Sequence, residues 1–203
     1  MERAKTVMGK NFIGPEELYS IRKRLGISMP LFAPPIPFDE ASLQKISDNA
    51  ILLLGLPMNI MELRSILGTN PKKEPCFYNQ DWYFNEPFAN KIKLENRWYL
   101  IKKTVDEVTR GKNPKEIAQK KNEQLPSAIL TAFTFFAYYF LTEGEILWNH
   151  DFLWCSDRDS NGDQIYTGRY IDPNGINKNG FNIHRYLSIR PSYAVAPEIL
   201  LTL

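Results

Sequence analysis

The sequence predicts an α+β fold in which an antiparallel sheet packs against one buried helix. The run AILTAFTFFAYYFL, residues 128–141, is apolar around most of a helical circumference, which is typical of a helix enclosed on several sides. From residue 146 onward, β-branched and aromatic stretches alternate with Asn-Gly turn dipeptides, which indicates short strands joined by hairpins. The 203 residues are 43% hydrophobic, so the chain can bury a sizeable core.

The first helix is predicted at Pro15, because proline favours the first helical turn, and Gly26 is its end signal. Residues 1–14 before it are expected to form a loose, flexible tail. Residues 28–38 after it, SMPLFAPPIPF, contain four prolines. These prolines exclude a helix or a central strand and predict an extended connector.

Short elements with local start signals follow the connector. Asp39 can cap a helix through its side chain. The apolar run at residues 50–57 predicts a buried strand, and Asn59 with Glu62 forms a capping box for the next helix. Residues 97–105, RWYLIKKTV, have the composition of a strand.

The chain divides by composition into two parts. Residues 15–124 are interpreted as a helical and irregular part packed on the body, and residues 125–203 as a β-rich part. We expect the two parts to form one compact unit. In the second part, Ser127 is the predicted cap of the core helix, and Gly144 lies just beyond its end.

An acidic stretch, SDRDSNGDQIYTGRY, places oxygen-bearing side chains at Asp157, Asp159, Asn161 and Asp163. The first positions match an EF-hand calcium loop, but the glutamate needed at the twelfth position is missing and both flanks have strand composition. The stretch therefore predicts a hairpin with a two-residue type I′ turn at its Asn-Gly pair, and acids that project into water. A different calcium site, built from the same four residues, is the alternative, with calcium or magnesium as the ion.

A divalent-metal hydrolase, nuclease-like in its chemistry, is the enzymatic alternative. It would use His150 with Asp157, Asp159 and Asp163, because a histidine and carboxylates can hold a metal that activates water. The candidate catalytic residues are His150, Asp157 and Asp159. The spacing matches no zinc signature, and the chain contains no G-x-S-x-G motif, P-loop or dinucleotide fingerprint.

The formal net charge of +2 argues against a protein whose affinity depends mainly on neutralising phosphates. Nucleic-acid binding stays a second alternative, through the lysine-rich residues 102–121 and the aromatic residues 77–88. The N-terminus lacks the apolar segment of a signal peptide, and the run at 128–141 is shorter than the roughly 20 residues of a membrane span. We therefore expect a cytoplasmic protein without a membrane partner. Cys76 and Cys155 could be free thiols or a single disulfide.

The C-terminal part resembles a known family. From Trp154 the sequence WCSDRDSNGDQIYTGRYIDPNGINKNGFNIHRYLSIRPSY runs through Trp-x-Ser, a polar turn, an aromatic strand, an Asn/Gly-rich turn and a strand that ends in Ser-x-Arg-Pro. This order is similar to the closing segment of bacterial and phage C-type-lectin-like domains, over roughly the last 80 residues. The disulfides of animal lectins cannot form with two cysteines, and the sugar-site signatures Glu-Pro-Asn and Trp-Asn-Asp are absent.

The resemblance implies a lectin-like C-terminal half that displays a loop surface to a protein or glycan ligand. The display residues it suggests are Tyr166, Arg169, Tyr170, Asn177, Asn179, Asn182 and Tyr186. Tyrosine, asparagine and arginine suit such a surface because they offer contact area and adaptable hydrogen bonds. A non-enzymatic binding protein is therefore the leading prediction, and the oligomeric state is left open.

Overall fold

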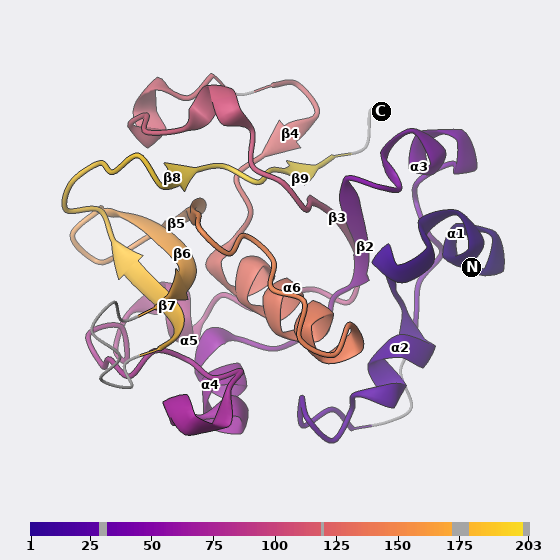
Figure 1. The fold of residues 1–203 in the computed structure, drawn as a ribbon, viewed down its shortest axis with the longest axis horizontal. Helices are drawn as coiled ribbons and strands as arrows, with labels where there is room; N and C mark the ends of the chain where they lie inside the picture. The colour runs from indigo at the N-terminus through magenta and orange to yellow at the C-terminus, as the bar shows by residue number, and fades with distance from the viewer. Residues whose placement is uncertain (29–31, 119, 172–178, 201–203) are drawn as a thin grey trace.

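The computed structural model describes residues 1–28, 32–118, 120–171 and 179–200. The fold consists of two mostly antiparallel sheets and several helices, with helix α6 at the centre (Figure 1). The five-stranded sheet has the order β1-β2-β3-β9-β4, and the four-stranded sheet has the order β7-β6-β5-β8. The α+β class that the sequence predicts is confirmed.

The helices are α1 (Glu2–Met8), α2 (Pro15–Ser20), α3 (Glu40–Ile46), α4 (Ile60–Leu67), α5 (Pro87–Asn90) and α6 (Ala128–Leu141), with 3-10 turns η1 (Gly9–Asn11), η2 (Pro71–Lys73), η3 (Glu107–Thr109) and η4 (Pro114–Glu116). The strands are β1 (Phe12–Ile13), β2 (Ala50–Leu54), β3 (Trp98–Lys102), β4 (Glu123–Gln124), β5 (Phe152–Arg158), β6 (Gln164–Tyr170), β7 (Gly180–Arg185), β8 (Tyr193–Ala194) and β9 (Glu198–Ile199).

Helix α6 is buried over its first eleven residues, from Ala128 to Tyr138. The hydroxyls of both threonines in this helix are hydrogen-bonded. Thr131 Oγ1 lies 2.9 Å from Thr167 Oγ1 of β6, and Thr134 Oγ1 donates to the carbonyl of Leu130 at 2.7 Å. The helix can therefore be enclosed on several sides without the cost of unsatisfied polar groups.

The local start signals in the sequence act as predicted. The Asp39 side chain accepts from Ser42 N–H at 2.8 Å at the start of α3. At the start of α4, Asn59 Oδ1 accepts from Glu62 N–H and the Glu62 carboxylate accepts from Asn59 N–H, both at 2.8 Å. The capping box is thus confirmed. The side chain of Ser127 accepts from Leu130 N–H at 3.2 Å and caps α6.

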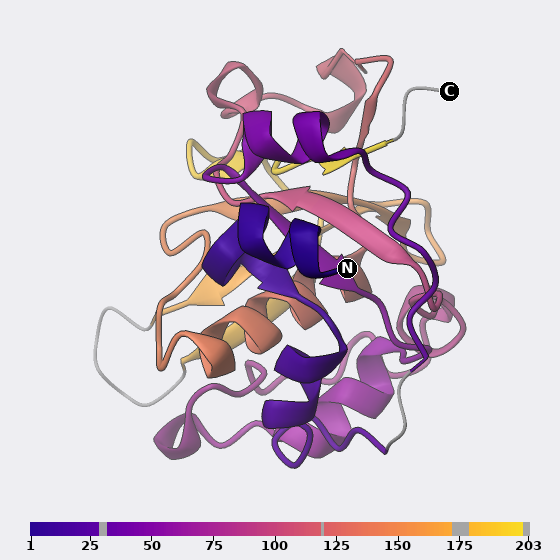
Figure 2. The same cartoon turned by 90° about the vertical axis from the view of Figure 1, so that its right-hand side faces the viewer.

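The predicted loose tail at residues 1–14 is wrong. Helix α1 and strand β1 occupy most of it, and Met8, Phe12 and Ile13 are buried. Strand β1 pairs in parallel with β2, so that Phe12 lies opposite Leu52. A two-residue strand is too short to show a periodic pattern, and the segment is ordered by long-range pairing instead. Figure 2 shows α1 and α3 side by side, and in Figure 1 they lie beyond β2 from α6.

The helix predicted from Pro15 to Gly26 is shorter than expected. Helix α2 ends at Ser20, and the chain continues through turns to Gly26, where φ is +60°. The two parts into which composition divides the chain, residues 15–124 and 125–203, are joined in the fold. Strand β9 of the second part pairs with β3 of the first. Both parts therefore contribute to the same sheet.

The predicted hairpin forms between β5 and β6, but its turn is longer than the predicted type I′ turn. Asp159 N–H donates to the Asp163 carbonyl and Gly162 N–H donates to the Asp159 carbonyl, both at 3.0 Å. Gly162 has φ +86°, whereas Asn161 does not have positive φ. These features describe a three-residue loop with a left-handed glycine. Strand β6 then pairs with β7 in antiparallel register.

No helix in the four described ranges has the length and apolar character that crossing a bilayer requires.

The cap of α6 gives the first prediction. Ser127→Ala leaves the Leu130 N–H without its side-chain acceptor, so it should lower the free energy of unfolding by about 1 kcal/mol. Urea unfolding followed by circular dichroism measures this change. Ser65→Ala, on the exposed side of α4, is the matched control and should stay within about 0.5 kcal/mol of wild type. An equal loss in both variants would show that the cap has no special role.

Candidate functional site

A groove of about 760 Å³ crosses the seam between the two sheets. Strands β3, β4 and β9 contribute to one side and strands β5 and β6 to the other. The groove also takes in the loop before β3, the turn η4 and the cap of α6. Its lining residues are Ile92, Lys93, Glu95, Arg97, Tyr99, Pro114, Lys115, Ile117, Gln124, Leu125, Ser127, Ser156, Arg158, Gln164 and Glu198.

A fixed network lies on the five-stranded side of the groove. Glu198 is 3% exposed, and its carboxylate accepts from Arg97 Nη2 at 2.9 Å and from Gln124 Nε2 at 2.8 Å. The Arg97 guanidinium also lies 3.7 Å from the centre of the Tyr99 ring. Burial raises the pKa of the Tyr99 phenol, whose oxygen accepts from Glu95 N–H at 2.9 Å. Arg97 is therefore held by an ion pair and by ring stacking.

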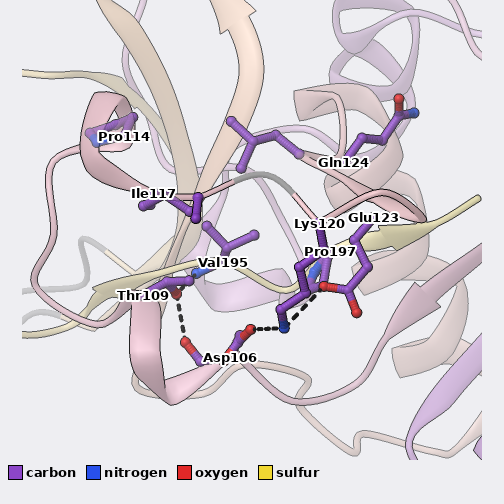
Figure 3. Close-up of a pocket in the computed structure, with 11 residues that line it drawn as sticks. Asp106, Thr109, Pro114, Ile117, Lys120, Glu123, Gln124, Val195 and Pro197 are labelled. Atoms are coloured by element: carbon purple, nitrogen blue, oxygen red, sulfur yellow. Dashed lines mark hydrogen bonds and ion pairs between the residues drawn. The ribbon is translucent and has the colours of Figure 1, made fainter.

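A small apolar pocket of about 50 Å³ adjoins the groove (Figure 3). Pro114, Ile117, Gln124 and Leu125 line both hollows. Val195 and Pro197, on the chain that leads from β8 to β9, complete the pocket. We refer to this hollow as the side pocket.

Residues 106–118 and 120–125 form a strap over the side pocket, and ion pairs hold it in place. Lys120 Nζ lies 2.5 Å from the Asp106 carboxylate and 3.4 Å from the Glu123 carboxylate (Figure 3). Thr109 Oγ1 donates to the Asp106 carbonyl at 2.6 Å and accepts from Val195 N–H at 2.9 Å. The strap is thus tied both to itself and to the chain beneath it.

A cationic end continues the groove beyond η4. Pro114, Lys115, Arg158 and Gln164 line both the groove and a further hollow of about 160 Å³. This hollow is completed by Asn113, Gly162, Asp163 and Tyr186. Pro114 lines all three hollows, so the groove, the side pocket and the cationic end meet at η4.

An aromatic cluster supports this surface from below. Trp154, Tyr166 and Tyr193 are buried together, and Ile117 and Leu125 of the strap pack against them. Trp154 Nε1 donates to the carbonyl of Lys112 at 3.2 Å. The sheet surface and the strap are therefore packed together, which favours a preformed hollow.

The predicted display residues on β6 and β7 are mostly engaged inside the molecule. Tyr166 is 7% exposed and stacks on His184 with ring centres 5.6 Å apart. Asn182 is 8% exposed and its Oδ1 accepts from Gln80 Nε2 at 2.7 Å. Arg169 forms an ion pair with Glu74 at 2.7 Å.

Three further display residues differ in their surroundings. Tyr170 is half-buried, and its ring lies 5.2 Å from the ring of Tyr78. Tyr186 packs against the aromatic cluster and lines the cationic end, so it reaches the candidate site. Asn179 precedes β7, with its carbonyl 3.9 Å from Cys76 Sγ. Asn177 lies outside the described residues.

The acids of the hairpin have structural partners. Asp157 Oδ2 accepts from Ala128 N–H, the first amide of α6, at 2.6 Å. The Asp159 side chain is fully buried, and its Oδ1 accepts from Asn161 N–H at 2.9 Å and from Asp163 N–H at 2.8 Å. The expectation that these acids project into water is wrong for Asp159, because its carboxylate organises the turn.

The predicted metal-binding residues do not assemble with a histidine. His150 is exposed in the turn before β5, and its Nε2 lies 3.4 Å from Asn149 Nδ2. The extended chain from Phe152 to Asp157 spans about 16 Å, so His150 and Asp157 stand near opposite ends of β5. In the part of the chain that the structure describes, no three His, Cys, Asp or Glu side chains gather as ligands for a metal ion.

The groove was not found from the sequence, because its residues come from distant segments. More than twenty residues of sequence separate each of its main segments from the next. These segments contain Arg97 and Tyr99, then Gln124 and Ser127, and finally Glu198. No local spacing joins them. The sequence did single out the lysine-rich stretch at residues 102–121, which contains the turn η4, as a nucleic-acid contact.

Asp157 gives a prediction about pH. Burial raises the pKa of its carboxyl above the ordinary value of 3.8, while the hydrogen bond from Ala128 acts in the opposite direction. The folded state therefore holds this proton more firmly than the unfolded chain, and ionisation lowers the free energy of unfolding as pH rises. Asp157→Asn keeps an acceptor for Ala128 and removes the charge.

Asp157→Asn should therefore raise the free energy of unfolding at pH 7. The advantage over wild type should fade as the pH falls through the raised pKa of the folded state, and it should be lost below 3.8, where the wild-type carboxyl becomes protonated in both states. Parallel urea titrations of the two proteins across this range measure it. A variant that is less stable at pH 7, or whose advantage grows on acidification, would contradict the proposed cost of burial.

The cysteines give a third prediction. Both thiols are free and buried, which settles the open question of a disulfide. Burial raises the pKa of Cys76 to about 11 and also raises the pKa of Cys155. Because the thiolate is the reactive form, neither thiol should react with Ellman's reagent at pH 8 in the folded protein, and both should react in guanidinium chloride. Rapid release of the coloured product by the folded protein would contradict this burial. The variant Cys76→Ser would then show which of the two thiols had reacted.

Comparisons with family models, with curated proteins and with solved structures gave no match to this chain. No family is therefore assigned, and the function is inferred from the groove itself.

Proposed function

We propose that this chain is a non-enzymatic binding protein that holds an extended segment of a partner protein in the groove between its two sheets. The observation that carries the proposal is the groove of about 760 Å³ with the side pocket opening beside it. A hollow of this size falls within the range of roughly 300–1,000 Å³ that is usual for binding sites. The fixed Arg97–Glu198 pair supports a preformed rather than a collapsing surface.

The chemistry of the groove favours a peptide over a compact apolar molecule. Ile92, Ile117 and Leu125 offer apolar contact, while Gln124, Ser127 and Ser156 offer hydrogen-bonding groups. A peptide presents both kinds of surface, because its backbone is polar and its side chains vary. The side pocket is suited to one apolar side chain of the segment, which would act as an anchor.

The glycan ligand and the lectin-like half stay predictions, and the proposal does not depend on them. A glycan site is usually built on an exposed aromatic face, but Tyr99 is 5% exposed and covered by Arg97. Of the display residues that the structure describes, Tyr186 alone lines the site.

Nucleic-acid binding and metal-dependent hydrolysis have less support. The side chains of Phe77, Tyr83 and Phe88 are buried, which removes them as stacking platforms for bases. Lys102 and Lys120 are both paired with Glu123. The carboxylates of Asp157 and Asp159 already accept backbone N–H groups.

A random-peptide display selection tests the proposal. Wild-type protein should enrich specific peptides, and Ser156→Trp should bind the synthesised peptides at least tenfold more weakly, because an indole at this exposed position fills the groove. Ser65→Trp, an equally large change on the surface of α4, should bind them as wild type does. Fluorescence anisotropy gives the affinities. Failure to enrich any peptide, or equal binding by Ser156→Trp, would reject the groove as a peptide site.

A further inference from the structure

We infer that the segment bound in the groove is acidic: one of its carboxylates lies between Lys115 and Arg158 at the cationic end, and an apolar side chain next to it fills the side pocket. This inference rests on the proposed function and names the class of its partner.

The charges in the groove differ in how far they are already neutralised. Arg97 is paired with Glu198 at 2.9 Å, and Lys93 is paired with Glu62 at 2.7 Å. These two cations therefore have partners within the protein. Their charge is largely satisfied, and they contribute to shape and hydrogen bonding more than to attraction of a ligand.

Among the described residues, Lys115 and Arg158 are the cations of the groove without an ion-pair partner. Both are exposed and line the groove and the cationic end together. Arg158 Nη1 donates to the carbonyl of Gly162 at 2.8 Å, which restrains the side chain without neutralising it. Within the described ranges, no carboxylate forms an ion pair with either residue. A guanidinium with remaining donors and a nearby ammonium suit a carboxylate.

One carboxylate, that of Asp163, offsets part of the positive charge of Lys115 and Arg158. Asp163 also lines the cationic end, where its side chain is half-buried. It lies in the same hairpin as Arg158, but its carboxylate does not come within the 4.0 Å of an ion pair with Arg158 or Lys115 in the described chain. The cationic end therefore keeps an excess of one positive charge. Asp163 should repel an acidic ligand, which gives the test a variant of opposite sign.

The side pocket fixes the second feature of the segment. It meets the cationic end at Pro114, so an acidic residue and an apolar residue would lie close together along the bound chain. The small volume of about 50 Å³ selects an aliphatic side chain over an aromatic one. An acidic and aliphatic pair distinguishes this ligand from nucleic acid, which has no aliphatic side chain to offer.

The experiment repeats the display selection with charge variants. Peptides enriched on wild type should be rich in Asp and Glu next to Leu, Ile or Val. Lys115→Gln and Arg158→Gln should each weaken their binding about fivefold, whereas Asp163→Asn should tighten it. Lys45→Gln removes an exposed lysine of α3, outside the groove, and should change nothing. Added sodium chloride should weaken wild-type binding more than binding to the double variant Lys115→Gln/Arg158→Gln.

The outcomes separate this inference from the proposed function. Enrichment of neutral or basic peptides that Lys115→Gln and Arg158→Gln still bind would overturn the acidic ligand and leave the groove as a peptide site. Failure to enrich any peptide would overturn both. Binding of oligo-dT or heparin that depends on Lys115 and Arg158, without peptide enrichment, would assign the cationic end to another polyanion and also overturn the inference.

Discussion

Burial of α6 on several sides is the constraint on which the rest of the structure depends. Eleven of its fourteen residues are buried, and a single sheet face can cover only one stripe of such a helix. Strands β5 and β6 of the four-stranded sheet and helix α4 contact α6, while the five-stranded sheet belongs to the same hydrophobic core. Two separate sheets around one core leave a seam between them. The groove lies at that seam, beside the cap Ser127 and next to Asp157, which accepts from the first amide of α6. The position of the candidate site is thus a consequence of how the helix is covered.

The seam also explains why the groove combines fixed and unpaired charges. A carboxylate as buried as that of Glu198 needs compensation, and Arg97 and Gln124 supply it. Lys115 and Arg158 lie further out, where water solvates them and no internal partner is required. The first group therefore gives the groove a defined shape, and the second leaves it able to attract a charged ligand.

Elements with local causes could be predicted from the sequence, whereas features with long-range causes could not. Asp39, Asn59 and Ser127 were identified as caps because a cap needs only residues within one turn. Strand β1 was missed because Phe12 and Ile13 depend on their partners in β2, Leu52 and Leu53, forty residues away. The turn at Gly162 was assigned one residue too short, because the sequence does not show that the Asp159 carboxylate accepts from Asn161 and thereby organises a longer loop. The groove unites five distant segments and leaves no local pattern.

The alternation of side chains along a strand explains why the predicted display residue Tyr166 is buried. On β6, Thr167 faces α6 and contacts Thr131, so Tyr166 points to the opposite side of the sheet. A sequence cannot say whether such a face meets water or another part of the chain. Here the strap covers it, and Tyr166 becomes part of the cluster against which Ile117 and Leu125 pack. Because the strap packs on this aromatic sheet face, the aromatic side chains support Ile117 and Leu125, which line the side pocket. It follows that the residues of the strap, together with strand residues that reach the groove, such as Arg158 of β5, determine what the surface can bind.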